Sequence, residues 1–272
     1  MCRLYGFIAT HPRKVSCELI QSQNSLLAQS KLDERGLDNS HGWGLGAYKK
    51  KHPYIVKQAE PASESEDFRW TAAETHSQCV ISHVRRATVG IVKLENTHPF
   101  GFEEWIMAHN GDIGNFDKVR PKMLNVMPPI IRKQIAGDTD SEHIFYFIMS
   151  LYQKHPETPI ATTIRTGILQ LKEWAKEANA TVAINLLFSN GKELIGTRHG
   201  PSLSYVKREN VHPCQVCGGA THIDPDCEQS TPYQAVAIAS EPITTNEKWV
   251  EVPQNSILWI NENMEFSQFP ID

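Results

Sequence analysis

The chain has 272 residues, of which 40% are hydrophobic and 21% charged, and its formal net charge is −4 at pH 7. This composition excludes a disordered or fibrous chain, and the slight acidic excess gives no reason to expect nucleic acid or an anionic membrane as a partner. Because no apolar run approaches the roughly 18 residues of a membrane span, and six cysteines are too few for a disulfide framework, we expect a cytoplasmic protein.

Hydrophobic periodicity predicts strands and helices in separate runs along the chain. Strands are expected at 5–10, 42–48, 54–59, 79–85, 105–109, 181–188, 193–197, 234–240, 256–260 and 265–269. Helices are expected at 15–30, 63–75, 144–152 and 159–178, and Thr139 with Glu142 has capping-box spacing before the third of these. Since no βαβ alternation is present, we expect one α+β layered domain with a loop-rich region near 207–232.

Cys2 is the first residue with catalytic potential. Its small side chain permits removal of Met1, which would leave a cysteine with a free α-amine. Such an amine has a pKa of about 7.7–8.0 and can act as a general base near neutral pH. One residue would then supply both nucleophile and base. The alternative is that Cys2 is only a small residue after the initiator.

Four further positions carry chemical signals that each have an ordinary structural alternative. Arg85 ends a predicted strand and could clamp a carboxylate, or be a surface arginine. His98 precedes a proline in an extended turn and is more often structural alone. Asn110 and Gly111 could form a two-donor oxyanion hole or a hairpin turn. Asp140 stands at a helix start, where capping explains it equally well.

Taken together, the motifs have a defined order along the chain. They are Met-Cys-Arg-Leu-x-Gly at 1–6, His-Gly-Trp-Gly at 41–44, Ser-His-x-Arg at 82–85, Glu-Asn-Thr-His-Pro-Phe at 95–100, Ala-His-Asn-Gly-Asp at 108–112 and Asp-Thr-Asp-Ser-Glu at 138–142. With these motifs the chain resembles a class II glutamine amidotransferase of the N-terminal nucleophile hydrolase superfamily. Residues 239–243 and 247–249 resemble the small stand-alone members, which lack a fused synthase domain. The resemblance implies a four-layer αββα sandwich and a single amidotransferase domain over 2–272, with Met1 removed.

The resemblance also implies a role for each matching residue. Cys2 would attack the γ-carbonyl of glutamine or another γ-glutamyl compound and form a thioester. Asn110 and the Gly111 N–H would hold the oxyanion. Arg85 would grip the substrate α-carboxylate, Asp140 would bind its α-ammonium, and His98 would line the pocket. No metal or cofactor is required.

Three positions depart from the pattern of the larger family members. Arg86 and Val89 stand where those members have an aromatic residue and a histidine, which leaves the contacts of that loop open. His41 replaces an acid before the Gly-Trp-Gly motif, and the sequence suggests no role for it.

A second group of residues supports a rival hypothesis. His212, Cys214, Cys217 and Cys227 could build a tetrahedral zinc site, although no second Cys-x-x-Cys completes the usual pattern. A redox pair or ordinary loop thiols are further alternatives.

Three functions therefore remain open. The first is glutaminase-type hydrolysis that releases glutamate and ammonia, and the second is hydrolysis of a γ-glutamyl peptide or conjugate. The third is a non-catalytic scaffold or zinc-binding protein on the same fold. The sequence also leaves two partners open, a separate synthetase or other acceptor for the ammonia, and a second copy of the chain.

Overall fold

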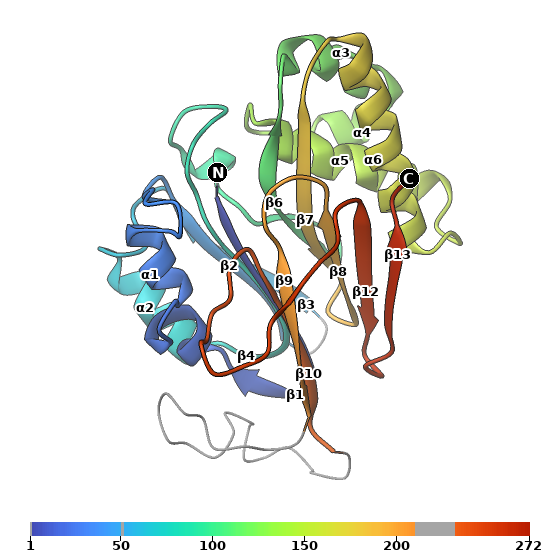
Figure 1. Ribbon diagram of the computed structural model, residues 1–272. Coiled ribbons are helices and arrows are strands. Elements are labelled where there is room, and N and C mark those ends of the chain that lie inside the picture. The colour runs from blue at the N-terminus through green and yellow to red at the C-terminus, as the bar shows by residue number, and fades with distance from the viewer. Residues whose placement is uncertain (1, 50–51, 210–231) are drawn as a thin grey trace.

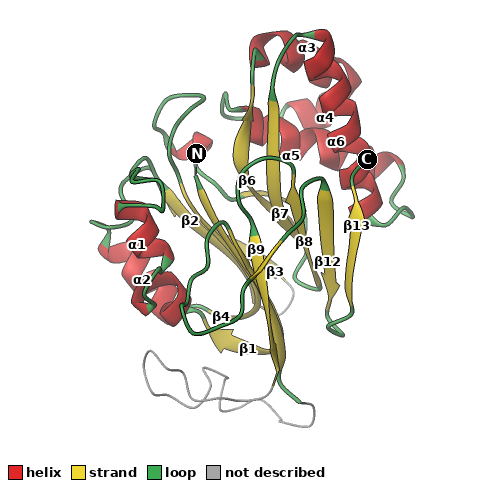
Figure 2. Ribbon diagram, viewed as in Figure 1, coloured by secondary structure: helices red, strands yellow, loops and turns green. Residues whose placement is uncertain are grey.

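The computed structural model describes residues 2–49, 52–209 and 232–272. Two antiparallel β-sheets pack face to face, and each is covered on its outer side by helices (Figures 1 and 2). The predicted α+β class and the four-layer αββα sandwich are confirmed.

The first sheet contains the N-terminal strand at its centre. Among the described residues its order is β11 (Val250–Glu251), β9 (Ser204–Glu209), β10 (Gln234–Ala239), β1 (Arg3–Lys14), β4 (His76–Val84), β2 (Trp43–Lys49) and β3 (His52–Gln58). The second sheet, in the same described part of the chain, has the order β13 (Phe266–Pro270), β12 (Ser256–Asn261), β8 (Glu193–Arg198), β7 (Val182–Ser189), β6 (Trp105–Ile113) and β5 (Phe100–Phe102).

Helices form the two outer layers. The first sheet is covered by a π-helical turn (Cys17–Gln21), α1 (Leu26–Lys31) and α2 (Glu66–Glu74). The second is covered by α3 (Phe116–Val126), α4 (Pro129–Arg132), α5 (Asp140–Lys154) and α6 (Ile160–Glu177). A short 3₁₀ turn lies at Leu94–Asn96. Within the described ranges, no helix combines the length and the apolar character needed to cross a membrane.

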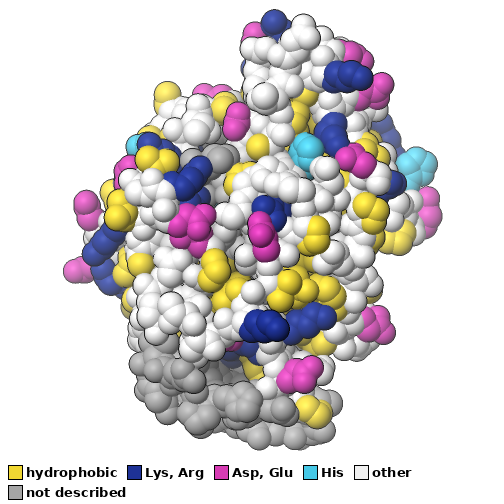
Figure 3. Space-filling model, viewed as in Figure 1, with side chains coloured by type: hydrophobic (Ala, Val, Ile, Leu, Met, Phe, Trp, Pro, Cys, Tyr) yellow, Lys and Arg dark blue, Asp and Glu magenta, His cyan; other side chains and the backbone are white. Residues whose placement is uncertain are grey.

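Strand β1 shows why the layers form. Tyr5 and Phe7 point toward the helices of the first sheet, whereas Leu4 and Ile8 point into the layer between the two sheets. Both faces of the strand are therefore buried, so it appears in the sequence as a continuous apolar run rather than an alternating one. On the outer surface, the face shown in Figure 3 carries basic and acidic side chains interspersed rather than in separate patches.

Several predicted boundaries differ from the structure: the strand expected at 5–10 spans 3–14, and the helix expected at 144–152 spans 140–154. Two further differences change the interpretation. The helix expected over 15–30 is two segments, because the side chain of Ser25 accepts a hydrogen bond from the N–H of Ala28 and so caps α1 as a new helix. The strand expected to end at His109 continues to Ile113, which places Asn110 and Gly111 inside β6 and excludes the hairpin-turn alternative.

Other elements were confirmed or missed. Thr139 caps α5 as predicted, because its hydroxyl accepts a hydrogen bond from the N–H of Glu142. The predictions contained no counterpart of α3, α4, β5, β9 or β11. Of the expected loop-rich region, residues 207–209 belong to β9, and 210–231 lie outside the described residues.

Candidate active site

The predicted site residues meet at one end of the sandwich. Cys2 directly precedes β1, and Arg85 directly follows the neighbouring strand β4. Together with His98, Gly111 and Asp140 they line a cavity of about 20 Å³, which has room for about one water molecule. Five of the six residues predicted from the sequence therefore share one cavity, although they are spread over almost 140 positions of the chain. The sixth, Asn110, lies in β6 directly before Gly111.

Cys2 is held by the backbone of the loop after β4. Its residue is 9% exposed, and its Sγ accepts a hydrogen bond from the N–H of Arg86 at 3.3 Å and donates to the carbonyl oxygen of Arg86 at 3.4 Å. Burial raises the pKa of the Cys2 thiol, and the N–H of Arg86 opposes that rise only in part. The thiol is therefore protonated near neutral pH, and attack on a carbonyl needs a base beside it.

Two of the three residues that depart from the pattern of the larger family members hold the loop after β4. His41 Nδ1 accepts a hydrogen bond from the N–H of Ala87 at 2.9 Å. The side chain of Arg86 forms an ion pair with Asp38 at 2.9 Å. Both contacts hold the segment whose backbone touches Cys2. His41 therefore has a structural role in this protein, which the sequence did not indicate.

Arg85 presents its guanidinium to the same loop. Nη1 donates to the carbonyl oxygen of Ile91 at 3.2 Å, and Nη2 donates to those of Val89 at 3.0 Å and Gly90 at 3.4 Å. Burial lowers the pKa of Arg85, but a guanidinium remains charged at any physiological pH. All three acceptors are neutral carbonyls, so a carboxylate that reached this guanidinium would form a stronger, charge-assisted pair.

Asp140 is the first residue of α5, and it joins that helix to β6. Its Oδ2 accepts a hydrogen bond from the N–H of Ile113 at 2.8 Å, and its Oδ1 accepts from the N–H of Ser141 at 2.8 Å. The hydroxyl of Ser141 in turn lies 2.9 Å from Nδ1 of His109. Because Thr139 is the N-cap, capping does not account for Asp140, and its carboxylate is placed at the cavity by three backbone and side-chain contacts.

His98 lines the cavity as a neutral ring. Its ring centroid lies 4.1 Å from that of His83, and neither nitrogen of His98 has a hydrogen-bond partner in the described part of the chain. Burial, together with neighbouring cationic and histidine side chains, holds the pKa of His98 well below its usual value. Burial likewise lowers the pKa of His83, to about 3. At neutral pH both rings are therefore uncharged and each keeps one N–H. His98 forms part of the cavity wall, and His83 packs behind it.

These two histidines predict a loss of stability in acid. An unfolded histidine titrates near pH 6.5, whereas the folded rings stay neutral, so the unfolded state binds more protons below that pH. The stability present above pH 6.5 should fall as the pH drops toward 3, by about 1.4 kcal/mol per pH unit for each ring. Urea unfolding of His83→Leu between pH 7 and pH 4 should show a smaller decline than the parent protein. An equal decline in both proteins would contradict this account.

Asn110 and Gly111, the two residues predicted to form an oxyanion hole, are consecutive in β6. Gly111 has φ +156°, and a Cβ there would lie 1.9 Å from the carbonyl oxygen of Ala183, so only glycine fits. Asn110 is fully buried, and its Nδ2 donates to the hydroxyl of Ser240 at 3.4 Å. The other N–H of that amide has no acceptor among the described residues, so it remains available to a second one.

Comparison with known families shows to which family the chain belongs. The model of the class-II glutamine amidotransferases matches residues 1–266. The chain belongs to this family. The resemblance stated from the sequence motifs is thereby confirmed.

Individual relatives of this class II amidotransferase agree with that assignment. A probable glutamine amidotransferase of Saccharomyces cerevisiae is 27% identical over 96% of this chain and 82% of its own length. A putative glutamine amidotransferase of Escherichia coli is 30% identical over 78% and 81%. A gamma-glutamyl-hercynylcysteine sulfoxide hydrolase of Mycobacterium tuberculosis is 26% identical over 96% and 94%.

Solved structures show the same fold as this amidotransferase. A glutamine aminotransferase class-II domain protein from Silicibacter pomeroyi superposes with a TM-score of 0.67 at 20% identity, and each chain is fully covered. A glutamine phosphoribosylpyrophosphate amidotransferase from Bacillus subtilis gives a TM-score of 0.64 at 16% identity, over all of this chain and 49% of that one. At these identities the likeness establishes the sandwich fold alone.

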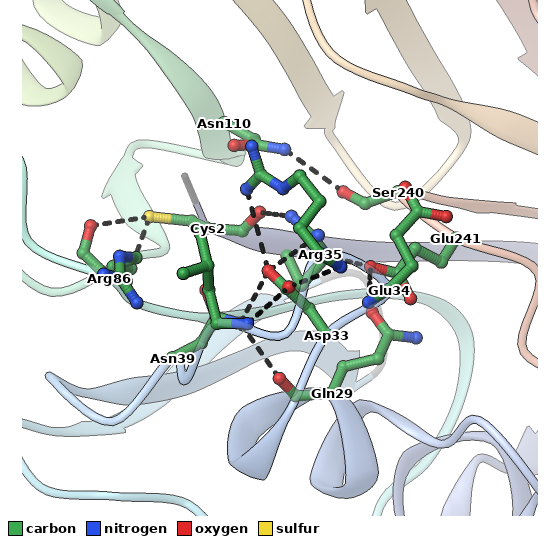
Figure 4. A network of polar contacts seen from close by, with 12 residues as sticks. Cys2, Gln29, Asp33, Glu34, Arg35, Asn39, Arg86, Asn110, Ser240 and Glu241 are labelled. Atoms are coloured by element: carbon green, nitrogen blue, oxygen red, sulfur yellow. Dashed lines mark hydrogen bonds and ion pairs between the residues drawn. The ribbon is translucent and has the colours of Figure 1, made fainter.

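Sequence reasoning missed a buried ionic cluster beside Cys2 in this class II amidotransferase. The guanidinium of Arg3 donates to the carbonyl oxygen of Cys2 at 3.0 Å, forms an ion pair with Asp33 at 2.7 Å, and forms a second ion pair with Glu241. Figure 4 shows Asp33 and Glu241 on the same side of Cys2. Arg3 itself could have indicated this cluster, since it is the only charged residue in the apolar run 2–9. A buried arginine needs acidic partners, so its position predicts carboxylates nearby.

The structure does not cover the candidate zinc ligands of this amidotransferase. His212, Cys214, Cys217 and Cys227 lie outside the described residues, as does Met1. The zinc hypothesis and the removal of Met1 therefore stay predictions.

Proposed function

We propose that this protein hydrolyses a γ-glutamyl amide bond through a thioester on Cys2 and releases glutamate and ammonia or another amine. The observation that carries the proposal is one cavity lined by the thiol of Cys2, the guanidinium of Arg85 and the carboxylate of Asp140. We further propose that residues 2–272 form a single amidotransferase domain from which Met1 has been removed.

The chemistry follows from the buried thiol. Once Met1 is removed, the α-amine of Cys2 takes the thiol proton, directly or through water, and Sγ attacks the γ-carbonyl carbon. The negative charge that develops on the carbonyl oxygen is held by Nδ2 of Asn110 and the N–H of Gly111. The C–N bond then breaks, the leaving amine accepts the proton, and the thioester forms. Water hydrolyses the thioester, which frees glutamate and regenerates the thiol.

Two charges would select the amino-acid head group. Arg85 would bind the substrate α-carboxylate in place of the loop carbonyls that it now contacts, and Asp140 would bind the α-ammonium. A glutamine inside a peptide has neither group free, so it would be rejected. The cavity must widen for a glutamyl group, and moving the loop at 89–91 would release the donors of Arg85 at the same time.

The substitution Arg85→Lys tests the head-group assignment. Lysine keeps the charge but loses the planar fork, so we expect KM for a γ-glutamyl amide to rise about 30-fold while kcat changes little. Lys93→Gln is a matched control, because Lys93 is a cation of the same loop that pairs with Asp138 at 3.3 Å. An unchanged KM for Arg85→Lys in a glutamate-release assay would remove Arg85 from the binding site.

A larger leaving group is the second candidate, favoured by one comparison. The relative from Mycobacterium tuberculosis is named as a hydrolase of a γ-glutamyl conjugate and matches 96% of this chain. The ratio of kcat/KM for glutamine to that for a γ-glutamyl dipeptide separates the two functions. If free glutamine is preferred, the released ammonia passes to water or to a separate synthetase partner, and a pulldown would identify that partner.

An intact mass spectrum tests the proposal as a whole. The protein is incubated with a diazo-ketone analogue of glutamine, and we expect a species that lacks Met1 and carries one adduct on Cys2. A protein without Met1 that stays unmodified would overturn the catalytic proposal and favour the scaffold hypothesis. A protein that retains Met1 is a precursor, and the assay is then repeated after an aminopeptidase has removed Met1.

A further inference from the structure

Two consecutive residues after β10 contact the two halves of the proposed catalytic machinery. Ser240 contacts Asn110 (Figure 4). Glu241 contacts Arg3, which in turn contacts Cys2. Both Ser240 and Glu241 are buried, at 1% and 2% exposure. This short segment therefore joins the nucleophile and the oxyanion donor, which come from different sheets.

The contact through Glu241 restricts the backbone of Cys2. Glu241 accepts hydrogen bonds from Arg3, from the N–H of Glu34 at 3.1 Å and from Nδ2 of Asn24 at 3.1 Å. The guanidinium of Arg3 is thereby fixed, and its Nη1 holds the carbonyl oxygen of Cys2 at 3.0 Å. A fixed carbonyl limits rotation about the Cα–C bond of Cys2, so the α-amine and Cβ keep one direction, while the backbone of Arg86 holds Sγ.

The contact through Ser240 orients the oxyanion donor. The hydroxyl oxygen of Ser240 accepts from the N–H of Leu4 at 2.9 Å and from Nδ2 of Asn110 at 3.4 Å, while the N–H of Ser240 donates to the carbonyl oxygen of Leu4 at 3.0 Å. Ser240 is therefore tied to β1 two residues from Cys2. Since Oδ1 of Asn110 has no hydrogen-bond partner among the described residues, this contact sets the rotation of the amide.

The alternative is that Glu241 only stabilises the fold, and a second buried carboxylate of this protein provides a comparison. Glu18 is a second buried carboxylate between arginines, because it pairs with Arg13 and with Arg208 at 2.6 Å. Burial opposes its ionised form, but Arg13 and Arg208 hold the pKa of Glu18 at about 2. Arg13 lies ten residues along β1 from Arg3, about 30 Å away, so this cluster stabilises the fold at the far end of the strand.

We propose that Ser240 and Glu241 are positioning residues that align the Asn110 amide and the Cys2 nucleophile for the same carbonyl. The inference rests on the proposed function, since alignment matters only if Cys2 attacks a carbonyl held by Asn110. Misalignment by about 1 Å can cost as much as 100-fold in rate, so the effect is measurable.

The experiment compares Ser240→Ala and Glu241→Gln with two matched controls. Ser77→Ala removes another buried hydroxyl of the same sheet, one that accepts from the N–H of Tyr48 at 3.2 Å, and Glu18→Gln neutralises the distant carboxylate. For each variant we measure kcat and KM on a γ-glutamyl dipeptide, urea unfolding, and two NMR signals. The signals are the side-chain amide of Asn110 and the Nε–H of Arg3.

We expect Ser240→Ala to lower kcat about tenfold or more with KM nearly unchanged, because transition-state contacts alone are lost. Its Asn110 amide signal should move or broaden, and Ser240→Thr should recover most of kcat. Glu241→Gln should shift the Nε–H signal of Arg3 and lower kcat several-fold. The controls should lose stability without these changes.

Each other outcome is decisive. The positioning role would be overturned by unchanged kcat in Ser240→Ala and Glu241→Gln, or by an unchanged Asn110 signal in Ser240→Ala. Equal kcat losses in the controls Ser77→Ala and Glu18→Gln would overturn it as well. If the parent protein hydrolyses no γ-glutamyl amide, the proposed function fails. The NMR signals then still decide whether Ser240 and Glu241 orient Asn110 and Arg3.

Discussion

Replacing Cys2 by alanine is expected to lower kcat for hydrolysis of a γ-glutamyl amide by about 10⁴-fold or more, with KM changed little. The nucleophile is lost and no thioester can form, whereas the oxyanion donors and the head-group charges remain. Glutamate release, measured with protein from which Met1 has been removed, gives both constants. The loss should be the same for glutamine and for a γ-glutamyl dipeptide, because both share the acyl step.

Cys79→Ala is the matched control for this result. Cys79 is another buried thiol of the same sheet, its Sγ lies 3.0 Å from the hydroxyl of Ser189, and burial raises its pKa to about 12. Its removal should cost stability and leave kcat near the parent value. Full hydrolysis by Cys2→Ala would show that Cys2 is not the nucleophile. Equal losses in both variants would indicate damage to the fold.

Gly111→Ala is expected to destabilise the protein by about 4 kcal/mol and to abolish measurable hydrolysis in whatever fraction folds. A Cβ at this position would lie 1.9 Å from the carbonyl oxygen of Ala183 on β7, and the backbone has φ +156°. The strand must shift to relieve the overlap, which adds a packing cost to the conformational cost. The same shift displaces the N–H proposed to hold the oxyanion.

Gly36→Ala is the control that separates the conformational cost from the packing cost. Gly36 also has a positive φ, +72°, but a Cβ there would meet nothing within 4 Å. It should lose only about 1 kcal/mol in urea unfolding and retain full activity. A Gly111→Ala protein as stable as the Gly36→Ala protein would show that β6 accommodates the methyl group, and the oxyanion assignment of Gly111 would lose its structural basis.

A large part of this fold could be predicted from the sequence, because many of the contacts that define its helices and strands join residues close together in the chain. The Thr139 hydroxyl reaches the N–H three residues along the chain, so capping-box spacing located the start of α5. The apolar run at 5–10 predicted the strand that the structure shows as β1. By contrast, α3 was missed because it has Pro121 inside it and follows Asn115 in the left-handed conformation, both of which usually indicate a turn.

The candidate site was likewise predicted in part and missed in part. Cys2, Arg85, His98, Gly111 and Asp140 were found because the order of their motifs matches that of a known family, and the cavity brings them together. The extension of β6 through the Asn-Gly pair was missed, because local propensity favours a turn there and only pairing with β7 makes it a strand.

The reactive groups and the local structures that present them follow from the amino-acid sequence. The distant groups that stabilise the reactive ones follow from the way the strands pair. Arg3 and Glu241 are 238 positions apart, and they meet because β1 and β10 pair side by side. Residue spacing does not predict an ion pair of this kind, because the pair depends on the order of strands in the sheet.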